Sequence, residues 1–353
     1  MCKQNSQTSN QTSALIAMSG GIDSTVAVLL AMRDGFDCTG AVMKLFPGAD
    51  KTVADAHFAA AKLEIPLHVC DFTKPFAEYV IEPFISAYQK GHTPNPCVFC
   101  NKHLKFGSLL NKALELGKDF IITGHYAQME IDANGRYLLK KGIDQSKDQS
   151  YVLYSLTQEQ LARVRFPVGG LTKSRVREFA LDSGLIGENN SESQDICFIP
   201  DGDYFKFITK YTGSKPDKGK FIDTGGNYLG ESRGVSSYTI GQRRGLGLAM
   251  PHPPYVVELR PKDNTVVIGK EDMLYSKSLT AGEINLIAAD RLDNSIKAQV
   301  KIRYSDPGHS AVVRQTDDDR LHIEFDEPQR AITKGQAAVI YDRNIVLGGG
   351  TIM

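Results

Sequence analysis

The sequence predicts an α/β protein with a doubly wound parallel sheet, followed by a small β-rich central domain and a C-terminal β-barrel-like domain. Strand-like and helix-like segments alternate over about the first 200 residues, which is typical of a parallel sheet with helices on both faces. Glycine and proline become dense after about residue 204, where the segments resemble hairpins. From about residue 280 apolar and polar residues alternate with period two, which indicates half-buried strands.

These changes divide the chain into four parts. The first is a tail rich in Ser, Thr, Asn and Gln, a composition typical of disorder. We expect this tail at residues 1–13, the parallel-sheet domain at 14–205, the central domain at 206–275 and the barrel at 276–353.

The elements of the parallel-sheet domain follow from short apolar runs and helical periodicity. Residues 14–18 form an apolar run that ends in a glycine-rich turn, and the helical periodicity of residues 24–33 stops at Gly35. We expect further strands at residues 39–46, 66–72 and 120–126 and a further helix at 53–63.

The second half of the chain is predicted to consist of antiparallel strands. Residues 255–259 and 265–268 flank a Pro-Lys-Asp-Asn turn and predict a hairpin. Apolar and polar residues alternate along 298–304 and 321–326, so each segment is predicted as a strand with one buried face.

The composition excludes several classes of protein. Lys plus Arg and Asp plus Glu number 41 each, so an RNA partner would require basic residues segregated onto one face. No run of 18 apolar residues occurs, and the first thirteen residues lack the apolar core of a secretory signal. We therefore expect a cytoplasmic protein without a membrane span, whose six cysteines stay reduced and matter through reactivity or metal binding.

Basic residues occur in three places that could form an RNA-binding face, although each could equally be a solvated surface. Lys301 and Arg303 share one face of the strand predicted at 298–304, and Arg243-Arg244 lies in a glycine-rich loop. A further basic stretch comprises Arg163, Arg165, Lys173, Arg175 and Arg177.

A phosphate-binding loop is predicted between the first strand and the first helix, at Ser19-Gly20-Gly21-Ile22-Asp23-Ser24. Two glycines let the backbone approach an oxyanion closely, and the helix that follows presents free N–H groups. The loop lacks the Gly-Lys-Ser/Thr of a Walker A motif and the spacing of a dinucleotide fingerprint. The alternative to a phosphate-binding loop is a purely structural tight turn in which a serine caps the helix.

Cys97 and Cys100 form a C-x-x-C motif that two prolines precede, so we expect a rigid, non-helical approach. Lys102, His103 and Lys105 follow closely. These cations, and a helix beginning at Asn101, would lower the pKa of the thiols and favour the thiolate.

Cys197 follows a polar stretch at residues 187–193, which we expect to be a mobile loop that could collect sulfur in one place and deliver it in another. Cys38 and Cys70 lie on or beside predicted buried strands and are expected to be ordinary core residues. A zinc site formed by His92, Cys97, Cys100 and His103 would match no common ligand spacing.

The S-G-G-x-D-S loop resembles the signature of PP-loop ATP pyrophosphatases, enzymes that adenylate a substrate oxygen and release pyrophosphate. That loop alone is also compatible with GMP synthetase, argininosuccinate synthetase and tRNA-lysidine synthetase. Over almost the whole chain the sequence resembles the tRNA-specific 2-thiouridylase family (MnmA/TrmU). The resemblance is carried by A-M-S-G-G-I-D-S at 17–24, T-P-N-P-x-x-x-C-N-K-x-x-K-F at 93–106, T-G-H-Y at 123–126, K-D-Q-S-Y at 147–151, I-C-F-I at 196–199, T-I-G-Q-R-R-G-L-G at 239–247, R-Y at 303–304 and L-G-G-G at 347–350.

The resemblance implies a PP-loop catalytic domain, a tRNA-contacting central domain and roles for the matching residues. Cys100 would be the nucleophile and Cys197 the persulfide carrier. ATP would be held by Ala17, Met18, Ser19, Gly20, Gly21, Ile22, Asp23, Ser24, Met43 and Gly124. Asn95, Pro96 and Cys97 would line the target base. Contacts with tRNA would come from His125, Lys147, Asp148, Gln149, Arg303, Tyr304 and Gln336.

The implied reaction replaces the C2 oxygen of the anticodon wobble uridine with sulfur. ATP with Mg²⁺ would adenylate that oxygen, and a persulfide on Cys197 would supply the sulfur, giving 2-thiouridine, AMP and pyrophosphate. The implied partners are the anticodon stem-loop of tRNA and a sulfur-relay donor protein or cysteine desulfurase.

The sequence departs from the family pattern at two places. Cys97 stands where many members have aspartate, and the stretch after Met43 is short. Cys97, Cys100 and Cys197 could therefore hold a [4Fe–4S] cluster instead of supporting persulfide chemistry, although clusters normally use four thiolates. Two rival functions are a different PP-loop ligase or amidotransferase, which would not need Cys100 or Cys197, and an RNA-binding protein with a metal site.

Overall fold

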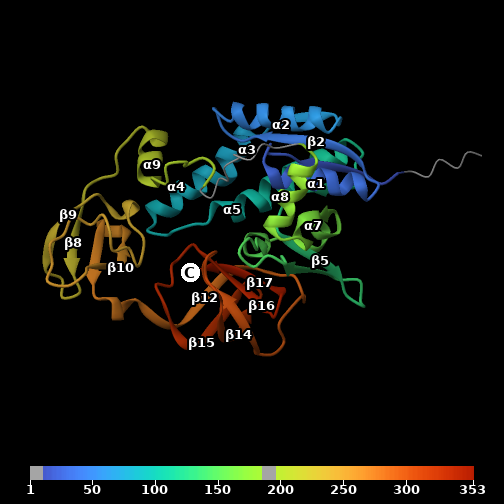
Figure 1. The fold of residues 1–353 in the computed structure, drawn as a ribbon. Helices are drawn as coiled ribbons and strands as arrows, with labels where there is room; N and C mark the ends of the chain where they lie inside the picture. Colours follow the sequence, from blue (N-terminus) through green and yellow to red (C-terminus); the bar gives the residue numbers. More distant parts are fainter. Residues whose placement is uncertain (1–10, 185–195) are drawn as a thin grey trace, which may run out of the picture.

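The computed structural model describes residues 11–184 and 196–353, and the chain forms three sheets (Figure 1). Most of the expected tail, together with the loop expected at 187–193, lies outside the described residues. The parallel-sheet part runs from blue to green in Figure 1, the central part is yellow to orange, and the C-terminal barrel is orange to red. No helix in the described ranges is long and apolar enough to cross a membrane.

The first sheet is parallel throughout and has the order β3-β2-β1-β4-β7. Its strands are β1 (Ser13–Ala17), β2 (Asp37–Lys44), β3 (Leu67–Asp71), β4 (Phe120–Ile122) and β7 (Val164–Arg165). The expected strands are confirmed, but the one predicted at 120–126 ends at Ile122.

Helices cover both faces of this sheet, because β1 alternates its buried side chains between two cores. Ala14 and Ile16 pack with residues of α1 (Ile22–Arg33), α2 (Asp50–Lys62) and α8 (Lys173–Asp182). Leu15 packs on the opposite side with residues of α6 (Leu109–Glu115). This two-sided burial is typical of parallel sheets and confirms the predicted fold class.

Two helices of this part contain π-helical segments. One consists of α3 (Thr73–Phe76), η1 (Ala77–Ile81) and α4 (Glu82–Gln89), and the other of α5 (Pro96–Phe99), η2 (Cys100–Ser108) and α6. The prediction of a non-helical approach to Cys100 is wrong, and the helix begins at Pro96 rather than at Asn101. Pro96 begins the helix, because a proline fits the first helical position, and the Asn95 side chain caps it by accepting a hydrogen bond from the Cys97 N–H at 3.1 Å.

The shorter helical segments lie in connections between these elements. They are η3 (Ser150–Leu153), α7 (Gln158–Ala162), η4 (Pro167–Gly170), η5 (Val235–Ser237), η6 (Pro261–Asp263) and η7 (Glu271–Leu274).

The central part begins with a helix that the sequence analysis did not predict, α9 (Tyr204–Thr212). A four-stranded sheet of order β10-β11-β8-β9 follows. Its strands are β8 (Gly219–Asp223), β9 (Tyr228–Ser232), β10 (Tyr255–Arg260) and β11 (Thr265–Gly269). The antiparallel pairing of β10 with β11 confirms the predicted hairpin.

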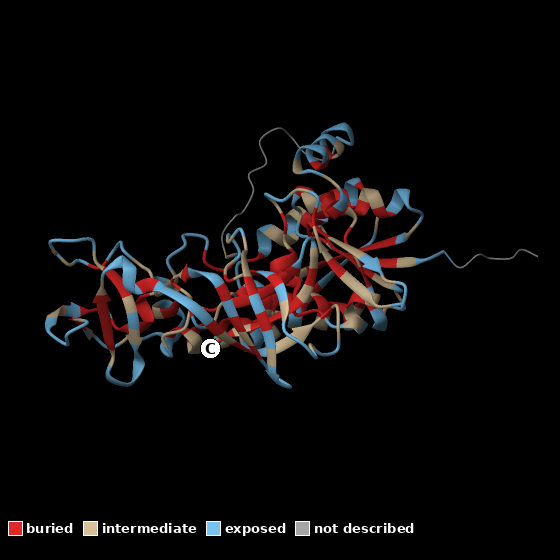
Figure 2. Ribbon diagram, turned by 90° about the horizontal axis from the view of Figure 1, so that it is seen from below, coloured by how far each residue is buried: buried red, intermediate tan, exposed pale blue. Residues whose placement is uncertain are grey.

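The C-terminal strands form a closed barrel of order β12-β15-β14-β13-β16-β17, in which β17 pairs back with β12. They are β12 (Tyr275–Leu286), β13 (Ile296–Lys301), β14 (His309–Asp317), β15 (Arg320–Arg330), β16 (Ala337–Asp342) and β17 (Ile345–Ile352). Leu321, Ile323 and Phe325 point into the core as their alternation predicted. Buried residues follow the centres of the barrel and of the parallel sheet (Figure 2).

A hairpin from the parallel-sheet part extends the barrel sheet. Strands β5 (Ala127–Ile131) and β6 (Tyr137–Lys141) pair with each other, and β6 pairs with β17. The sequence analysis did not predict this hairpin. It ties the region after β4 directly to the barrel.

All three parts meet at Thr93. Its N–H donates to the Lys334 carbonyl oxygen at 2.8 Å, and the Gln336 side chain donates to the Thr93 carbonyl oxygen at 2.8 Å. The Thr93 hydroxyl donates to the Thr239 hydroxyl of the central part at 3.1 Å. The segment that leads into the cysteine helix is therefore held from the barrel and the central part together.

The barrel core should carry much of the stability of the C-terminal part. Phe325 is 1% exposed, so Phe325→Ala should lower the free energy of unfolding by about 3–5 kcal/mol through lost burial and the cavity left behind. Val312, which is 38% exposed on β14, offers a matched truncation, and Val312→Ala should change stability by less than about 0.5 kcal/mol. Urea unfolding of both variants measures the difference, and equal losses would contradict the assignment of Phe325 to the core.

Candidate active site

The Gly-rich loop joins β1 to α1 in a conformation that requires glycine. Gly20 has φ of +73°, and a Cβ at this position would lie 2.3 Å from the Cβ of Asp55. Gly21 is the N-cap of α1 and no side chain caps the helix, so the alternative of a serine cap is wrong. The hydroxyls of Ser24 and Thr25 both donate back to the Gly21 carbonyl oxygen at 2.9 Å. The uncapped N–H groups of this helix end suit a phosphate.

Asp23 anchors a polar cluster beside the loop. Tyr126 Oη donates to Asp23 Oδ1 at 2.7 Å, and Lys173 Nζ donates to the same oxygen at 2.6 Å. Lys173 was grouped with the basic RNA-binding stretch, but it lies at the start of α8 next to the loop. The structure therefore adds a cation to the candidate phosphate site that the sequence analysis assigned elsewhere.

The segment Thr123–Tyr126 follows β4 and lies against the loop. Gly124 is so close to α1 that a Cβ would meet the Asp23 carbonyl carbon at 2.7 Å and the Ser24 nitrogen at 2.8 Å. Two residues later, Tyr126 reaches Asp23 through its hydroxyl. Glycine at position 124 is therefore required by the close packing of two backbones.

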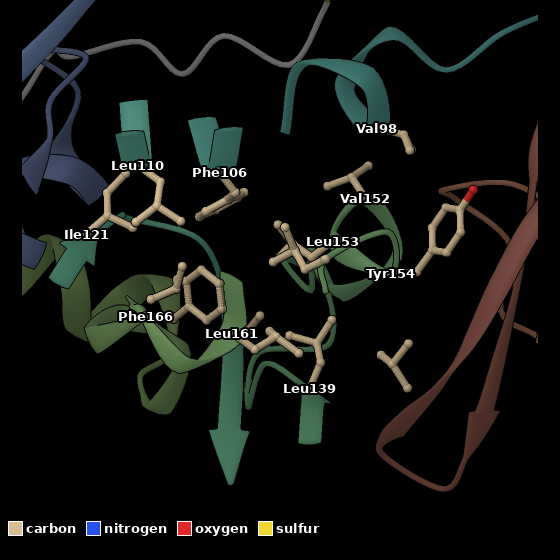
Figure 3. Close-up of a cluster of buried hydrophobic side chains, with 14 of the residues drawn as sticks. Val98, Phe106, Leu110, Ile121, Leu139, Val152, Leu153, Tyr154, Leu161 and Phe166 are labelled. Carbon is tan, nitrogen blue, oxygen red and sulfur yellow. The ribbon is translucent and has the colours of Figure 1, made fainter. Parts of the chain in front are cut away.

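His125, the residue between them, points away from the loop into the core. Its ring lies 5.8 Å from the ring of Phe106 and 6.0 Å from that of Phe166, and Figure 3 shows these two phenylalanines as neighbours in the buried cluster. Its Nδ1 lies 2.8 Å from the Thr123 hydroxyl, and its Nε2 lies 3.4 Å from Lys105 Nζ. Burial, aided by the Lys105 charge, holds the His125 pKa well below its ordinary value. The buried ring supports Lys105, and its expected contact with tRNA stays a prediction.

The structure brings Cys97, Cys100 and Cys197 together. Cys100 is buried in a cluster with Phe198 and Ile199, the two residues that follow Cys197. Cys97 and Cys197 keep solvent exposure, and the three thiols are close enough to influence one another electrostatically. Cys38 and Cys70 are buried, as predicted.

The thiols are less acidic than the sequence analysis expected. Burial raises the pKa of Cys100 to about 12 and that of Cys197 to about 11, and it also raises the pKa of Cys97. The Lys105 ammonium opposes all three shifts but is outweighed. The expected lowering by nearby cations is wrong because desolvation of a thiolate costs more than one ammonium returns.

The barrel contributes Tyr304, which lies near both the cysteines and residues 147–149. Burial raises the Tyr304 pKa, with smaller contributions from the charges of Asp148 and Cys97. The Tyr304 ring packs edge-to-face on Tyr151 at 6.1 Å and remains 45% exposed. An exposed aromatic ring beside a thiol can stack on a nucleobase.

Arg303, its neighbour, does not lie on the predicted strand, because β13 ends at Lys301. Its guanidinium donates to the Ala331 carbonyl oxygen and, at 3.3 Å, to the Thr333 hydroxyl. Arg303 therefore braces a loop of the barrel, and the expectation that it shares a strand face with Lys301 is wrong.

Several other predicted site residues organise loops. The Asp148 carboxylate is buried and accepts hydrogen bonds from Gly142 N–H and from the Ser150 N–H and hydroxyl. The Gln149 side chain accepts from the Tyr126 N–H at 3.0 Å. Ala17 and Met43 pack at the edge of the core that contains Leu15, whereas Met18 and Ile22 lie in the core on the opposite face of the sheet. Pro96 is buried. The Gln336 side chain donates a hydrogen bond to Thr93.

Sequence reasoning did not assign Lys173, Tyr126 and Lys105 to the site. Tyr126 stood in the Thr-Gly-His-Tyr block, and Lys105 was noted only as a cation near the cysteines. Their roles depend on contacts between distant segments, which no local pattern displays.

The described residues do not form a metal or cluster site from protein side chains alone. Among residues 11–184 and 196–353 no group of three or more His, Cys, Asp or Glu side chains is arranged to hold a metal ion. The three cysteines therefore do not present a cluster site in this arrangement.

Comparison with known proteins agrees with the three-part architecture. The family model described as "tRNA methyl transferase HUP domain" matches residues 12–201. The "tRNA methyl transferase PRC-barrel domain" matches residues 205–270, and the "Aminomethyltransferase beta-barrel domain" matches 276–352.

The curated relatives decide the family. The tRNA-specific 2-thiouridylase MnmA of Clostridioides difficile (strain 630) is 45% identical over 96% of this chain and 97% of its own length. The corresponding protein of Acetivibrio thermocellus is also 45% identical, over 96% of this chain and 98% of its own. The chain belongs to the tRNA-specific 2-thiouridylase family. A solved 4-thiouridine synthetase–RNA complex with bound ATP is 21% identical over 49% of this chain and 41% of its own, with a TM-score of 0.32.

The packing of Gly124 against the phosphate loop should be essential for binding ATP. Gly124→Ala places a methyl group 2.7 Å from the Asp23 carbonyl carbon, so the loop must move, and ATP affinity should fall at least about tenfold. Gly170→Ala is the matched control, because nothing lies within 4 Å of the added methyl group. Calorimetric titration with ATP distinguishes the two variants, and an unchanged affinity of Gly124→Ala would contradict the loop assignment.

Proposed function

We propose that this enzyme is a tRNA 2-thiouridylase, which replaces the C2 oxygen of the anticodon wobble uridine with sulfur at the expense of ATP. One observation carries the proposal. The Thr123–Tyr126 segment contacts the phosphate loop through Gly124 and Tyr126, and it reaches the helix of the cysteines through His125. A nucleotide site and a thiol site are thus built onto the same few residues.

Adenylation would take place at the phosphate loop. The uridine C2 oxygen attacks the α-phosphorus of ATP, and the bond to the β-phosphate breaks to release pyrophosphate. The N–H groups of the loop and the Lys173 ammonium would stabilise the charge that develops on the phosphates. The Asp23 carboxylate, 33% exposed beside the loop, fits as a ligand for Mg²⁺ together with phosphate oxygens. When bound, Mg²⁺ supplies further positive charge to the phosphates.

Sulfur transfer would use the difference in exposure between the two cysteines. Cys197 is exposed and can receive a sulfane sulfur from a donor protein, whereas Cys100 is buried behind it. The Cys100 thiolate attacks Sγ of Cys197, and the sulfane sulfur leaves as hydrosulfide. The two cysteines are oxidised to a disulfide while the sulfane sulfur is reduced, and an external dithiol restores the thiols. Hydrosulfide then attacks C2 and displaces AMP.

The RNA substrate would be the anticodon stem-loop of tRNA, with the target uridine flipped out of the stack. Asn95, Pro96 and Cys97 are proposed to line the base. The proposed tRNA contacts are His125, Lys147, Asp148, Gln149, Arg303, Tyr304 and Gln336. The proposed location is the cytoplasm, and the proposed sulfur donor is a sulfur-relay protein or a cysteine desulfurase. Tyr304 is the best supported of these contacts because its exposed ring lies near Cys97.

A methyl-transfer reaction, which the family-model description suggests, is less well supported. Methyl transfer needs neither a phosphate loop with a paired carboxylate nor three clustered thiols. A metabolite ligase would use the loop but leave the cysteines without a role. The thiolation reaction is the function that uses both sites.

The adenylation step is tested at Asp23. Asp23→Ala removes the acceptor shared by Lys173 and Tyr126, so tRNA-dependent pyrophosphate release should fall at least about a hundredfold while tRNA binding persists. Asp55→Ala is the control, because Asp55 flanks the same loop but pairs with Lys51 on the surface of α2. Normal release by Asp23→Ala would overturn the assignment.

The cysteines separate the persulfide route from the cluster route. Because Cys97 only lines the base in the persulfide route, Cys97→Asp should keep substantial thiolation activity, whereas Cys100→Ser and Cys197→Ser should lose it. Protein purified without oxygen should be colourless and active with a persulfide donor. Stoichiometric iron, with an absorbance shoulder lost in Cys97→Ser and activity that follows iron content, would replace the persulfide route with the cluster.

A further inference from the structure

The π-helical winding of η2 places Lys105 beneath the cysteines. In an α-helix, side chains three or four positions apart share a face, whereas the wider π-helix has backbone hydrogen bonds between residues i and i+5. Cys100 and Lys105 are five positions apart and are both within η2. Because a π-helix has more residues per turn, five positions separate two side chains by a smaller rotation than in an α-helix. Lys105 is accordingly close enough to act electrostatically on all three thiols.

His125 fixes the position of the Lys105 ammonium. An ammonium group can only donate, so Lys105 Nζ donates to His125 Nε2 at 3.4 Å, and His125 Nδ1 must carry the ring proton. That proton is donated to the Thr123 hydroxyl at 2.8 Å. The ring is buried and clamped between Phe106 and Phe166, so it stays neutral and holds the ammonium in one place.

The sulfur-transfer step needs a positive charge at this point. Both the attack by Cys100 and the departure of the sulfane sulfur place negative charge on sulfur, and Cys100 itself is buried. Within residues 11–184 and 196–353, the charged or titratable groups that interact with the three thiols are Lys105, the thiols themselves and Tyr304, which interacts with Cys97. Burial opposes ionisation of each thiol, and among the residues that the structure describes Lys105 is the cation that acts on all three.

We propose that Lys105 supplies the counter-charge for sulfur transfer and that His125 is the positioning residue that holds it there. This proposal rests on the proposed thiolation function. The Lys105 ammonium pairs first with the Cys100 thiolate, whose proton has passed to solvent, and then with the hydrosulfide that leaves Cys197. Lys105 remains protonated throughout, so the electron balance is that of the two cysteines and the sulfane sulfur.

The test measures thiol acidity directly, without tRNA or ATP. The rate of iodoacetamide alkylation of Cys197 in the full chain is followed against pH by peptide mass spectrometry. Lys105→Met should move the midpoint upward by about one pH unit, and Lys105→Arg should restore most of the shift. Lys102→Met is the matched control: it removes an equal charge three residues earlier, where the side chain is exposed, and should leave the midpoint in place.

Two further measurements test the proposal, one on a His125 variant and one on the thiolation reaction. His125→Phe keeps the ring packing but removes the acceptor, so it should shift the midpoint in the same direction by a smaller amount. Single-turnover thiolation by Lys105→Met should fall at least about tenfold at pH 7 and recover as pH rises, while tRNA-dependent pyrophosphate release persists. An unmoved alkylation midpoint in Lys105→Met would overturn the proposal. Absence of pyrophosphate release in the unaltered enzyme would instead overturn the proposed function.

Discussion

The contact between the Gly124 backbone and the phosphate loop is the constraint on which the rest of the site depends. A single methyl group would not fit between Gly124 and Asp23, so the segment after β4 has one place to lie. Once Gly124 is seated, Tyr126 reaches Asp23 and His125 must point inward toward Lys105. The distance between nucleotide and thiols is thereby fixed by backbone packing. Adenylation takes place on the oxygen bonded to C2, and sulfur then attacks C2 itself, so this rigidity serves the chemistry directly.

Burial of the thiols has a consequence for how the site is controlled. Raised pKa values keep Cys100 and Cys197 protonated near neutral pH, which protects them from oxidation until a reaction demands a thiolate. Cys197 alone of this pair is exposed, so sulfur has a defined direction of entry. The barrel places Tyr304 near Cys97, and the hydrogen bonds of Thr93 link the barrel and the central part to the segment that leads into the cysteine helix.

Patterns confined to a short stretch were predicted correctly from sequence. Period-two alternation identified β15, the Pro-Lys-Asp-Asn turn identified the β10–β11 hairpin, and the glycine-rich loop was placed between strand and helix. The failures came where tertiary contacts outweigh local preference. Prolines suggested an extended approach to the cysteines, yet Pro96 begins a helix whose winding becomes π-helical. The basic residues Lys173 and Arg303 suggested surface charge, yet one pairs with Asp23 and the other braces the barrel. The charge of a basic residue does not by itself reveal whether the residue pairs with a carboxylate of the protein or with a phosphate of a ligand.

The central claim is that the C2 oxygen of the target uridine is adenylated and that sulfur then attacks C2 within the same site. The direct measurement places a heavy-oxygen label at C2 of the wobble uridine of an anticodon stem-loop RNA and follows it through one turnover by mass spectrometry. Because AMP leaves with the oxygen that attacked ATP, the label should appear in the phosphate of AMP, at one atom for each 2-thiouridine formed. Label found in water or in pyrophosphate, with 2-thiouridine still produced, would contradict the account.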